Sequence, residues 1–120
     1  ALTPIATPGH TAGALSWQWQ SCDRQQSCKT IVYADSLTAV SSDDYRFSDH
    51  PANLAAFRAS IERVAGLGSC DILLTPHPSA SGMRDKLVSG DLTGAPRCAD
   101  YAAGLEVRLD ERLFKEAGPE

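Results

Sequence analysis

The order of hydrophobic patterns along the chain constrains its fold more than any other feature. Apolar and polar side chains alternate over residues 14–20, which predicts a half-buried strand. Leu15, Trp17 and Trp19 share one of its faces. After a polar tip, residues 29–34 have the composition of its hairpin partner.

Apolar residues then recur at helical spacing in two stretches. The first, 51–65, has Ser48 or Asp49 as a candidate cap, Pro51 in its first turn and Gly66 at its end. The second helix is expected over residues 96–117, where one stripe contains Cys98, Tyr101, Leu105, Leu109 and Leu113.

Two shorter stretches complete the predicted sheet. Residues 3–7 contain Pro4 and suit an edge strand, whereas residues 70–75 show little alternation, as expected for a strand covered on both faces. Residues 35–49 are rich in Ser and Asp and are expected to form a loop. Because helices alternate with strands late in the chain, the order predicts an α/β fold, with a mixed sheet covered by helices on at least one face.

Charge and length exclude some classes of function. The 120 residues fit one domain, and no internal boundary is visible. A formal charge of −4 without a run of like charges argues against a nucleic-acid or anionic-membrane partner. No apolar stretch reaches the ~18 residues of a membrane span. The opening "ALTPIATPGH" has no signal-peptide pattern, which a mature chain would have lost.

Four cysteines indicate an oxidising compartment. None forms a Cys-x-x-Cys pair, so a zinc knuckle is not expected. Cys22 and Cys28 flank a short polar tip, and the even count suggests the disulfides Cys22–Cys28 and Cys70–Cys98. Three connectivities are formally possible, and four reduced thiols in a cytosolic protein are the alternative.

Two histidines occupy matching contexts. His10 lies in "TPGHTAG" and His77 in "LLTPHPSASG", each in a turn after a short apolar strand. A metal ligand needs a fixed imidazole, and flanking proline and glycine fix the path of the backbone. The alternative is that both histidines merely occupy tight turns. His50 has no such context and is expected at the surface or at the start of a helix.

Two imidazoles do not complete a catalytic zinc site, which takes three protein ligands and a water. Asp35 and Asp71 are the candidate third ligands, and Asp35 is better placed because it follows a predicted strand. Neither a His-x-His-x-Asp-His cluster nor a His-Glu-x-x-His helix is present. The chain therefore presents only part of a metal site.

Three segments carry a family resemblance. "TPGHTAGALSWQW", "IVYADSLTAVS" and "CDILLTPHPSASG" resemble the C-terminal half of the metallo-β-lactamases, specifically the third subclass of class B, over nearly the whole chain. "PGHTxG" alone marks the broad superfamily. "YADSL" followed by "TPHPSAS" is far more specific to the lactamases of this subclass.

The resemblance implies a four-layer αββα sandwich with two Zn²⁺ ions along the edge between its sheets. In such a site His10 would complete a three-histidine zinc site, and His77 would complete the second site. The remaining ligands would come from a His-x-His-x-Asp-His loop in the N-terminal half. Ser36 matches a serine that stands where other subclasses place a zinc-binding cysteine, and Ser36 and Thr38 match the hydroxyls that hold the carboxylate of the drug. The two disulfides suggested above also match the family.

The implied activity is zinc-dependent hydrolysis of the β-lactam amide bond of penicillins, cephalosporins and carbapenems by a metal-bound hydroxide. This predicts a periplasmic protein of antibiotic resistance in which residues 1–120 are the C-terminal half of one domain and the N-terminal half is absent. Without that half, one face of the sheet is expected to lack cover, including four apolar residues: Trp17, Trp19, Ile31 and Leu73. We therefore expect the isolated chain neither to fold cooperatively nor to hydrolyse nitrocefin.

Two alternatives remain. The first is another hydrolase of the superfamily, such as a glyoxalase-type thioesterase, in which Asp35 would bridge two metals. Disulfides argue against it, because those enzymes work in reducing cytosol. The second is a metal-free, non-enzymatic fragment whose histidines only shape turns.

Overall fold

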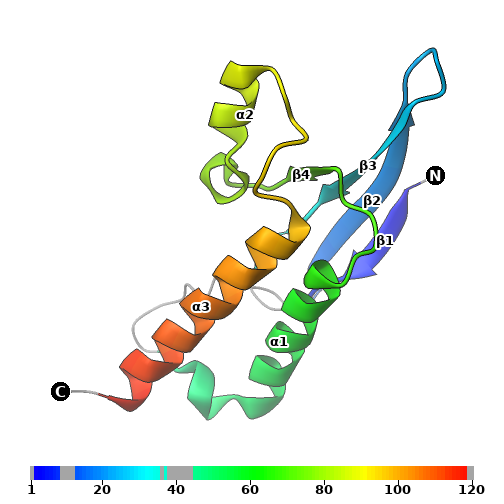
Figure 1. Cartoon of the computed structure of the whole chain (residues 1–120). Helices are drawn as coiled ribbons and strands as arrows, with labels where there is room; N and C mark the ends of the chain where they lie inside the picture. The colour runs from blue at the N-terminus through cyan, green and yellow to red at the C-terminus, as the bar shows by residue number, and fades with distance from the viewer. Residues whose placement is uncertain (1, 9–12, 36, 38–44, 119–120) are drawn as a thin grey trace.

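The fold is built on one mixed sheet of four strands (Figure 1). The computed structural model describes residues 2–8, 13–35, 37 and 45–118. The strands lie in the order of the chain: β1 (Thr3–Ala6), β2 (Leu15–Cys22), β3 (Cys28–Tyr33) and β4 (Ile72–Leu74). Antiparallel pairing joins the first three strands, and β4 runs parallel to β3. The predicted α/β class and the mixed sheet are thereby confirmed.

A short turn closes the β2–β3 hairpin. The Asp23 carboxylate accepts hydrogen bonds from the backbone N–H groups of Gln25 and Ser27, both at 2.9 Å. Such a side-chain contact replaces part of the backbone bonding that a turn lacks. The Cys22–Cys28 disulfide joins the last paired residues of the two strands.

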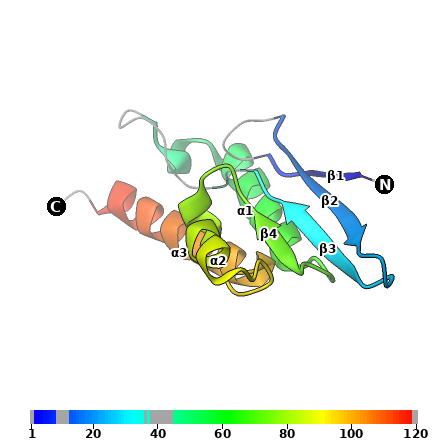
Figure 2. The same cartoon turned by 90° about the horizontal axis from the view of Figure 1, so that it is seen from above.

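Two long helices cover one face of the sheet. Helix α1 (Pro51–Ala65) and helix α3 (Cys98–Ala117) run antiparallel, side by side (Figures 1 and 2). Val32 and Leu73 are fully buried in the core that the sheet shares with these helices. Arg58 links the helices through contacts to Glu106 (2.7 Å) and Asp110 (2.8 Å).

The helix boundaries agree closely with the sequence pattern. Helix α1 has the predicted limits, with Gly66 as its C-cap. Its predicted cap is wrong, because His50 occupies the N-cap position without a side-chain capping bond. Ser48 and Asp49 belong instead to a short 3-10 helix, η1 (Phe47–Asp49). The apolar stripe of α3 faces the core as predicted.

Two short elements between β4 and α3 were not expected from the sequence. They are the 3-10 helix η2 (Pro78–Ser81) and helix α2 (Met83–Ser89). Downstream of them, the Cys70–Cys98 disulfide joins the segment before β4 to the start of α3. Both suggested disulfides are therefore confirmed. Among the described residues, no helix is long and apolar enough to cross a membrane.

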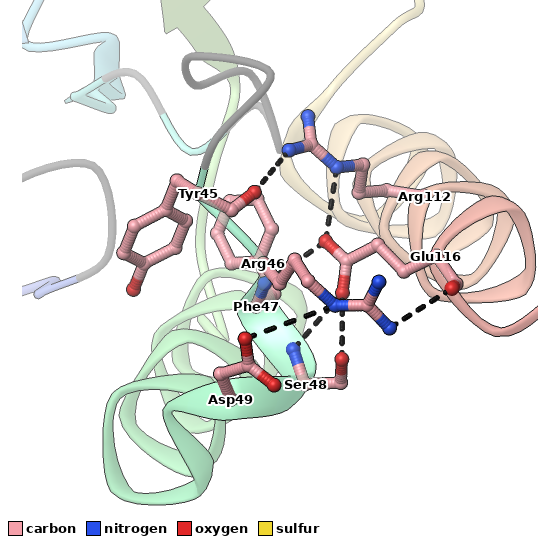
Figure 3. A network of polar contacts seen from close by, with 7 residues as sticks. All are labelled: Tyr45, Arg46, Phe47, Ser48, Asp49, Arg112 and Glu116. Atoms are coloured by element: carbon pink, nitrogen blue, oxygen red, sulfur yellow. Dashed lines mark hydrogen bonds and ion pairs between the residues drawn. The ribbon is translucent and has the colours of Figure 1, made fainter.

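Polar contacts anchor the segment that enters α1 (Figure 3). Near the end of α3, the Glu116 carboxylate accepts hydrogen bonds from the backbone N–H groups of Phe47 (2.9 Å) and Ser48 (3.0 Å). It also accepts from the Ser48 hydroxyl (2.9 Å) and from Arg112 Nε (3.0 Å). Arg112 Nη2 in turn donates to the Tyr45 carbonyl at 2.6 Å. Burial alone would raise the pKa of Glu116, but the donors from Ser48, Phe47 and Arg112 outweigh it and lower the pKa to about 2.

The second face of the sheet is apolar and only partly covered. Strand register places a row of apolar cross-strand pairs there, among them Trp17–Tyr33, Trp19–Ile31 and Tyr33–Leu74. All five of these side chains are intermediate in exposure and lie outside the core shared with the helices.

The structure corrects one expectation about this sheet. Leu73, expected to lack cover, points to the helices and is fully buried. Within β2 the buried residue is Ser16, on the face opposite Leu15 and Trp17, where its hydroxyl hydrogen-bonds to the Thr7 hydroxyl at 2.9 Å. The predicted alternation of polar and apolar residues in β2 is confirmed, and the side that carries Ser16 faces the interior.

Candidate metal centre

His77 follows β4 in a turn that leaves its side chain outside the core. Pro76 and Pro78 flank it, and a residue before proline is held extended. The backbone angles of His77 are indeed extended, with φ −102° and ψ 111°. His77 is also the N-cap of η2, but its side chain makes no capping hydrogen bond. The exposed imidazole therefore has its ring nitrogens available for a ligand.

A pocket of about 240 Å³ opens beside this turn. Its lining combines hydroxyl groups, an imidazole and one cation: Thr75, Pro76, His77, Ser79, Ala80, Tyr101 and Arg108. Tyr101 Oη donates to the Asp35 carbonyl at 3.3 Å. Burial raises the pKa of the Tyr101 phenol, so it stays a neutral donor at physiological pH.

Asp35 lies just beyond β3, as the sequence indicated. Its backbone N–H donates to the Ser16 hydroxyl at 3.0 Å, and the preceding Ala34 N–H donates to the Leu74 carbonyl at 2.9 Å. These contacts fix the backbone at the strand ends beside the pocket. A metal contact by the Asp35 carboxylate stays a prediction.

Asp71 has a structural role, which corrects its place among the candidate ligands. Its carboxylate accepts a hydrogen bond from the Thr30 N–H at 2.8 Å, and its own N–H donates to the Thr30 carbonyl at 2.9 Å. It precedes β4, whereas His77 follows that strand. The two side chains thus lie at opposite ends of β4.

Three residues of the predicted site, His10, Ser36 and Thr38, lie outside the described residues. Convergence of His10 with His77 therefore stays a prediction. In the described ranges, no group of three or more His, Cys, Asp or Glu side chains is placed to hold a metal ion. His50 is exposed at the start of α1, as expected, and stacks on Tyr45 with ring centroids 4.6 Å apart.

Among the described residues, His77 has the chemistry of one zinc ligand. An exposed imidazole on a stiff turn is a suitable zinc ligand, because zinc takes nitrogen donors at a fixed distance and angle. All four cysteines are bonded in disulfides, so a thiolate ligand from this chain is excluded. Thr75 and Tyr101, beside the pocket, were not predicted from the sequence as residues of the site, and Tyr101 was named only in the apolar stripe of α3. For Thr75, its position between β4 and His77 is the one sequence signal that points to the site.

Comparison with solved structures places the chain among known proteins, although no family model matches it. The metallo-β-lactamase MIM-1 from Novosphingobium pentaromativorans is 48% identical, with a TM-score of 0.91, over 99% of this chain and 44% of that one. SMB-1, a metallo-β-lactamase solved with bound 2-mercaptoethanesulfonate, is 43% identical, with a TM-score of 0.87, over 97% of this chain and 46% of its own. MEM-A1, a subclass B3 metallo-β-lactamase from a soil metagenome library, is 36% identical, with a TM-score of 0.89, over 100% of this chain and 48% of its own. The chain thus spans less than half the length of these relatives.

Proposed function

We propose that this chain, whose sequence and fold match part of the subclass B3 metallo-β-lactamases, works within a zinc hydrolase that opens the β-lactam ring. The observation that carries the proposal is the match of almost the entire chain at 48% identity, with an exposed imidazole at the end of β4. Penicillins, cephalosporins and carbapenems are the proposed substrates.

His77 and His10 are the zinc ligands that this chain would contribute, one to each of two sites. The other ligands, in a His-x-His-x-Asp-His loop, would come from a segment beyond these residues. When bound, zinc would lower the pKa of a coordinated water and would polarise the lactam carbonyl. The role of His77 is to present a neutral ring nitrogen from a rigid turn, which keeps the ligand oriented through the reaction.

Substrate orientation is the proposed role of the two hydroxyls in "ADSLT". Ser36 and Thr38 would donate hydrogen bonds to the carboxylate of the drug. Each hydrogen bond would contribute somewhat more than the usual ~1 kcal/mol, because the acceptor is charged. These contacts bind the ground state and the transition state alike. Their loss is therefore expected mainly as a higher KM.

The partly covered sheet face supports a further partner within the same fold. Its aromatic and aliphatic rows form a continuous apolar surface, and such surfaces are usually covered in the working protein. The relatives are more than twice as long as this chain. We infer that a complementary segment, which completes the four-layer sandwich, covers this face and supplies the remaining ligands.

The two disulfides support an oxidising location. Disulfides persist in the periplasm and in secreted proteins but are rare in the reducing cytosol. We propose a periplasmic protein that contributes to resistance against β-lactam antibiotics. The same bonds argue against a cytosolic glyoxalase-type thioesterase.

The test uses the chain joined to the complementary segment, with zinc content and nitrocefin hydrolysis as readouts. We expect two zinc ions and turnover for the unaltered protein. His77→Ala should lose one zinc and most of the activity. His50→Ala is the matched control, since His50 is also exposed but lies at the start of α1, and both readouts should be unchanged. Two zinc ions retained in His77→Ala would remove this residue from the ligand set.

A further inference from the structure

The turn that carries His77 is held from inside by two hydroxyl groups. Thr75 Oγ1 donates to the His77 carbonyl at 2.7 Å. The hydroxyls of Thr75 and Ser81 lie 2.9 Å apart. Ser81 is fully buried at the end of η2, so its hydroxyl must find its partner inside the protein.

The Thr75 hydroxyl is the donor in both contacts, and its single proton is shared between the His77 carbonyl and the Ser81 hydroxyl. The Ser81 hydroxyl has its own acceptor, the Pro78 carbonyl, at 3.5 Å. The Thr75 hydroxyl is therefore held between the backbone of His77 and the buried Ser81.

The local sequence makes the turn depend on side-chain hydroxyls for its hydrogen bonds. Pro76 and Pro78 have no backbone N–H, so the turn has fewer donors than an ordinary one. The His77 carbonyl nevertheless receives two, Thr75 Oγ1 and the Ala80 N–H at 3.0 Å. Two donors fix the peptide plane that follows the His77 Cα. The direction in which the imidazole leaves the backbone is thereby restricted as well.

Contacts between the end of η2 and the segment before α3 hold the chain around Ser81 in place. Gly82, next to Ser81, has a φ of +64°, and a Cβ built there would lie 3.0 Å from Pro96 Cδ. Four residues on, Lys86 Nζ donates to the Pro96 carbonyl at 2.8 Å. The junction between η2 and α2 is therefore pressed against the segment that leads into α3.

We propose that Thr75 is a positioning residue for the metal ligand His77, with the buried Ser81 hydroxyl holding the Thr75 side chain in place. The inference rests on the proposed function, because it needs His77 to bind zinc. It assigns to Thr75 no contact with substrate. The proposed effect of Thr75 is on the orientation of the His77 imidazole relative to the metal.

The test compares Thr75→Val, which keeps the shape and removes the hydroxyl, with Thr75→Ser, which keeps the hydroxyl. Both are made in the zinc-loaded protein that includes the complementary segment, and zinc affinity is measured by competition with a chelator. Thr75→Val should weaken one of the two zinc sites about 10- to 100-fold, the usual loss for a residue that orients a ligand, and leave the other unchanged. Thr75→Ser should restore wild-type affinity. Wild-type affinity at both sites in Thr75→Val would overturn the proposal.

A second variant keeps the test decisive if Thr75→Val does not fold. Ser81→Ala leaves the Thr75–His77 contact in place and removes only the second partner of the Thr75 hydroxyl. We expect a smaller loss at the same zinc site, of about 3- to 10-fold. No loss in Ser81→Ala, with far-UV circular dichroism unchanged, would overturn the role assigned to Ser81.

Failure of the proposed function gives a different pattern. If the unaltered protein binds no zinc, or His77→Ala keeps both ions, the function and this inference fall together. If the unaltered protein binds two ions and His77→Ala binds one, while Thr75→Val behaves as the unaltered protein, only the inference fails.

Discussion

Both faces of the four-stranded sheet carry apolar residues, yet the two faces have different surroundings. On one face, Val32 and Leu73 are fully buried beneath α1 and α3. On the other, Trp17, Trp19 and Ile31 remain partly exposed although they are paired across neighbouring strands. The chain thus completes one core by itself and leaves a second surface that resembles a core without its other layer. Folding of the helix layer and completion of the proposed zinc site accordingly depend on different contacts.

The strongest way to break this comparison is to remove the proposed complementary layer. We expect the chain alone to show no sharp thermal transition and no zinc-dependent hydrolysis of nitrocefin, because an aromatic sheet face exposed to water favours association over folding. Differential scanning calorimetry and a dye that binds exposed apolar surface provide the measurements. A cooperative transition with turnover from the chain alone would show that the second face needs no cover.

Single substitutions on each face sharpen the comparison. In the protein that includes the complementary segment, Trp19→Ala should lower the free energy of unfolding by about 3–5 kcal/mol, and Leu73→Ala by about 2–5 kcal/mol, because both would then leave cavities. Urea denaturation measures both changes. Leu87, 64% exposed on α2, is the control, and Leu87→Ala should change stability by no more than about 0.5 kcal/mol. A loss for Trp19→Ala as small as the control would mean that its face stays open.

The smallest effect concerns the helix layer alone. The folded-state pKa of Glu116, about 2, lies below its ordinary value of 4.5. Its contribution is therefore fully present above about pH 4.5 and is lost as pH falls toward 2. Because the Glu116 carboxylate is held by donors from Phe47, Ser48 and Arg112, of which Ser48 is exposed to solvent, we expect Glu116→Gln to cost about 1–2 kcal/mol at pH 7.

The pH dependence supplies the check on Glu116. Urea denaturation at pH 7 and pH 3 should show the difference between the unaltered protein and Glu116→Gln shrinking at the lower pH. Glu111→Gln, an exposed carboxylate on the same helix, should show little difference at either pH. An equal difference at both pH values would contradict the role of the Glu116 charge.

Local patterns predicted what depends on local chemistry. Pro51 and Gly66 marked the ends of α1 because one suits a first helical turn and the other a helix end. Contacts distant in sequence were not predictable in this way. Ser48 and Asp49 are good caps in isolation, yet the donors at Phe47 and Ser48 are satisfied by a carboxylate 69 and 68 residues further along the chain.

The same distinction applies to the candidate site. The prolines around His77 indicated a turn with a restricted backbone, and His77 has the extended backbone that a residue before proline favours. The burial of Ser16 and Ser81 was not visible, because a serine has no apolar side chain that marks the interior. Asp71 was misjudged because its partner, Thr30, lies on another strand.

The Cys70–Cys98 disulfide closes a covalent ring of the backbone, and β4, His77 and α2 are part of this ring. Its two cysteines are 28 residues apart. A protease that cuts once inside this ring cannot separate the pieces, since the disulfide still joins them. A nicked protein would therefore run as one species on a non-reducing gel and as two after reduction. His77 would stay tethered to the start of α3 throughout, so a single cut in the ring need not release this imidazole from the molecule.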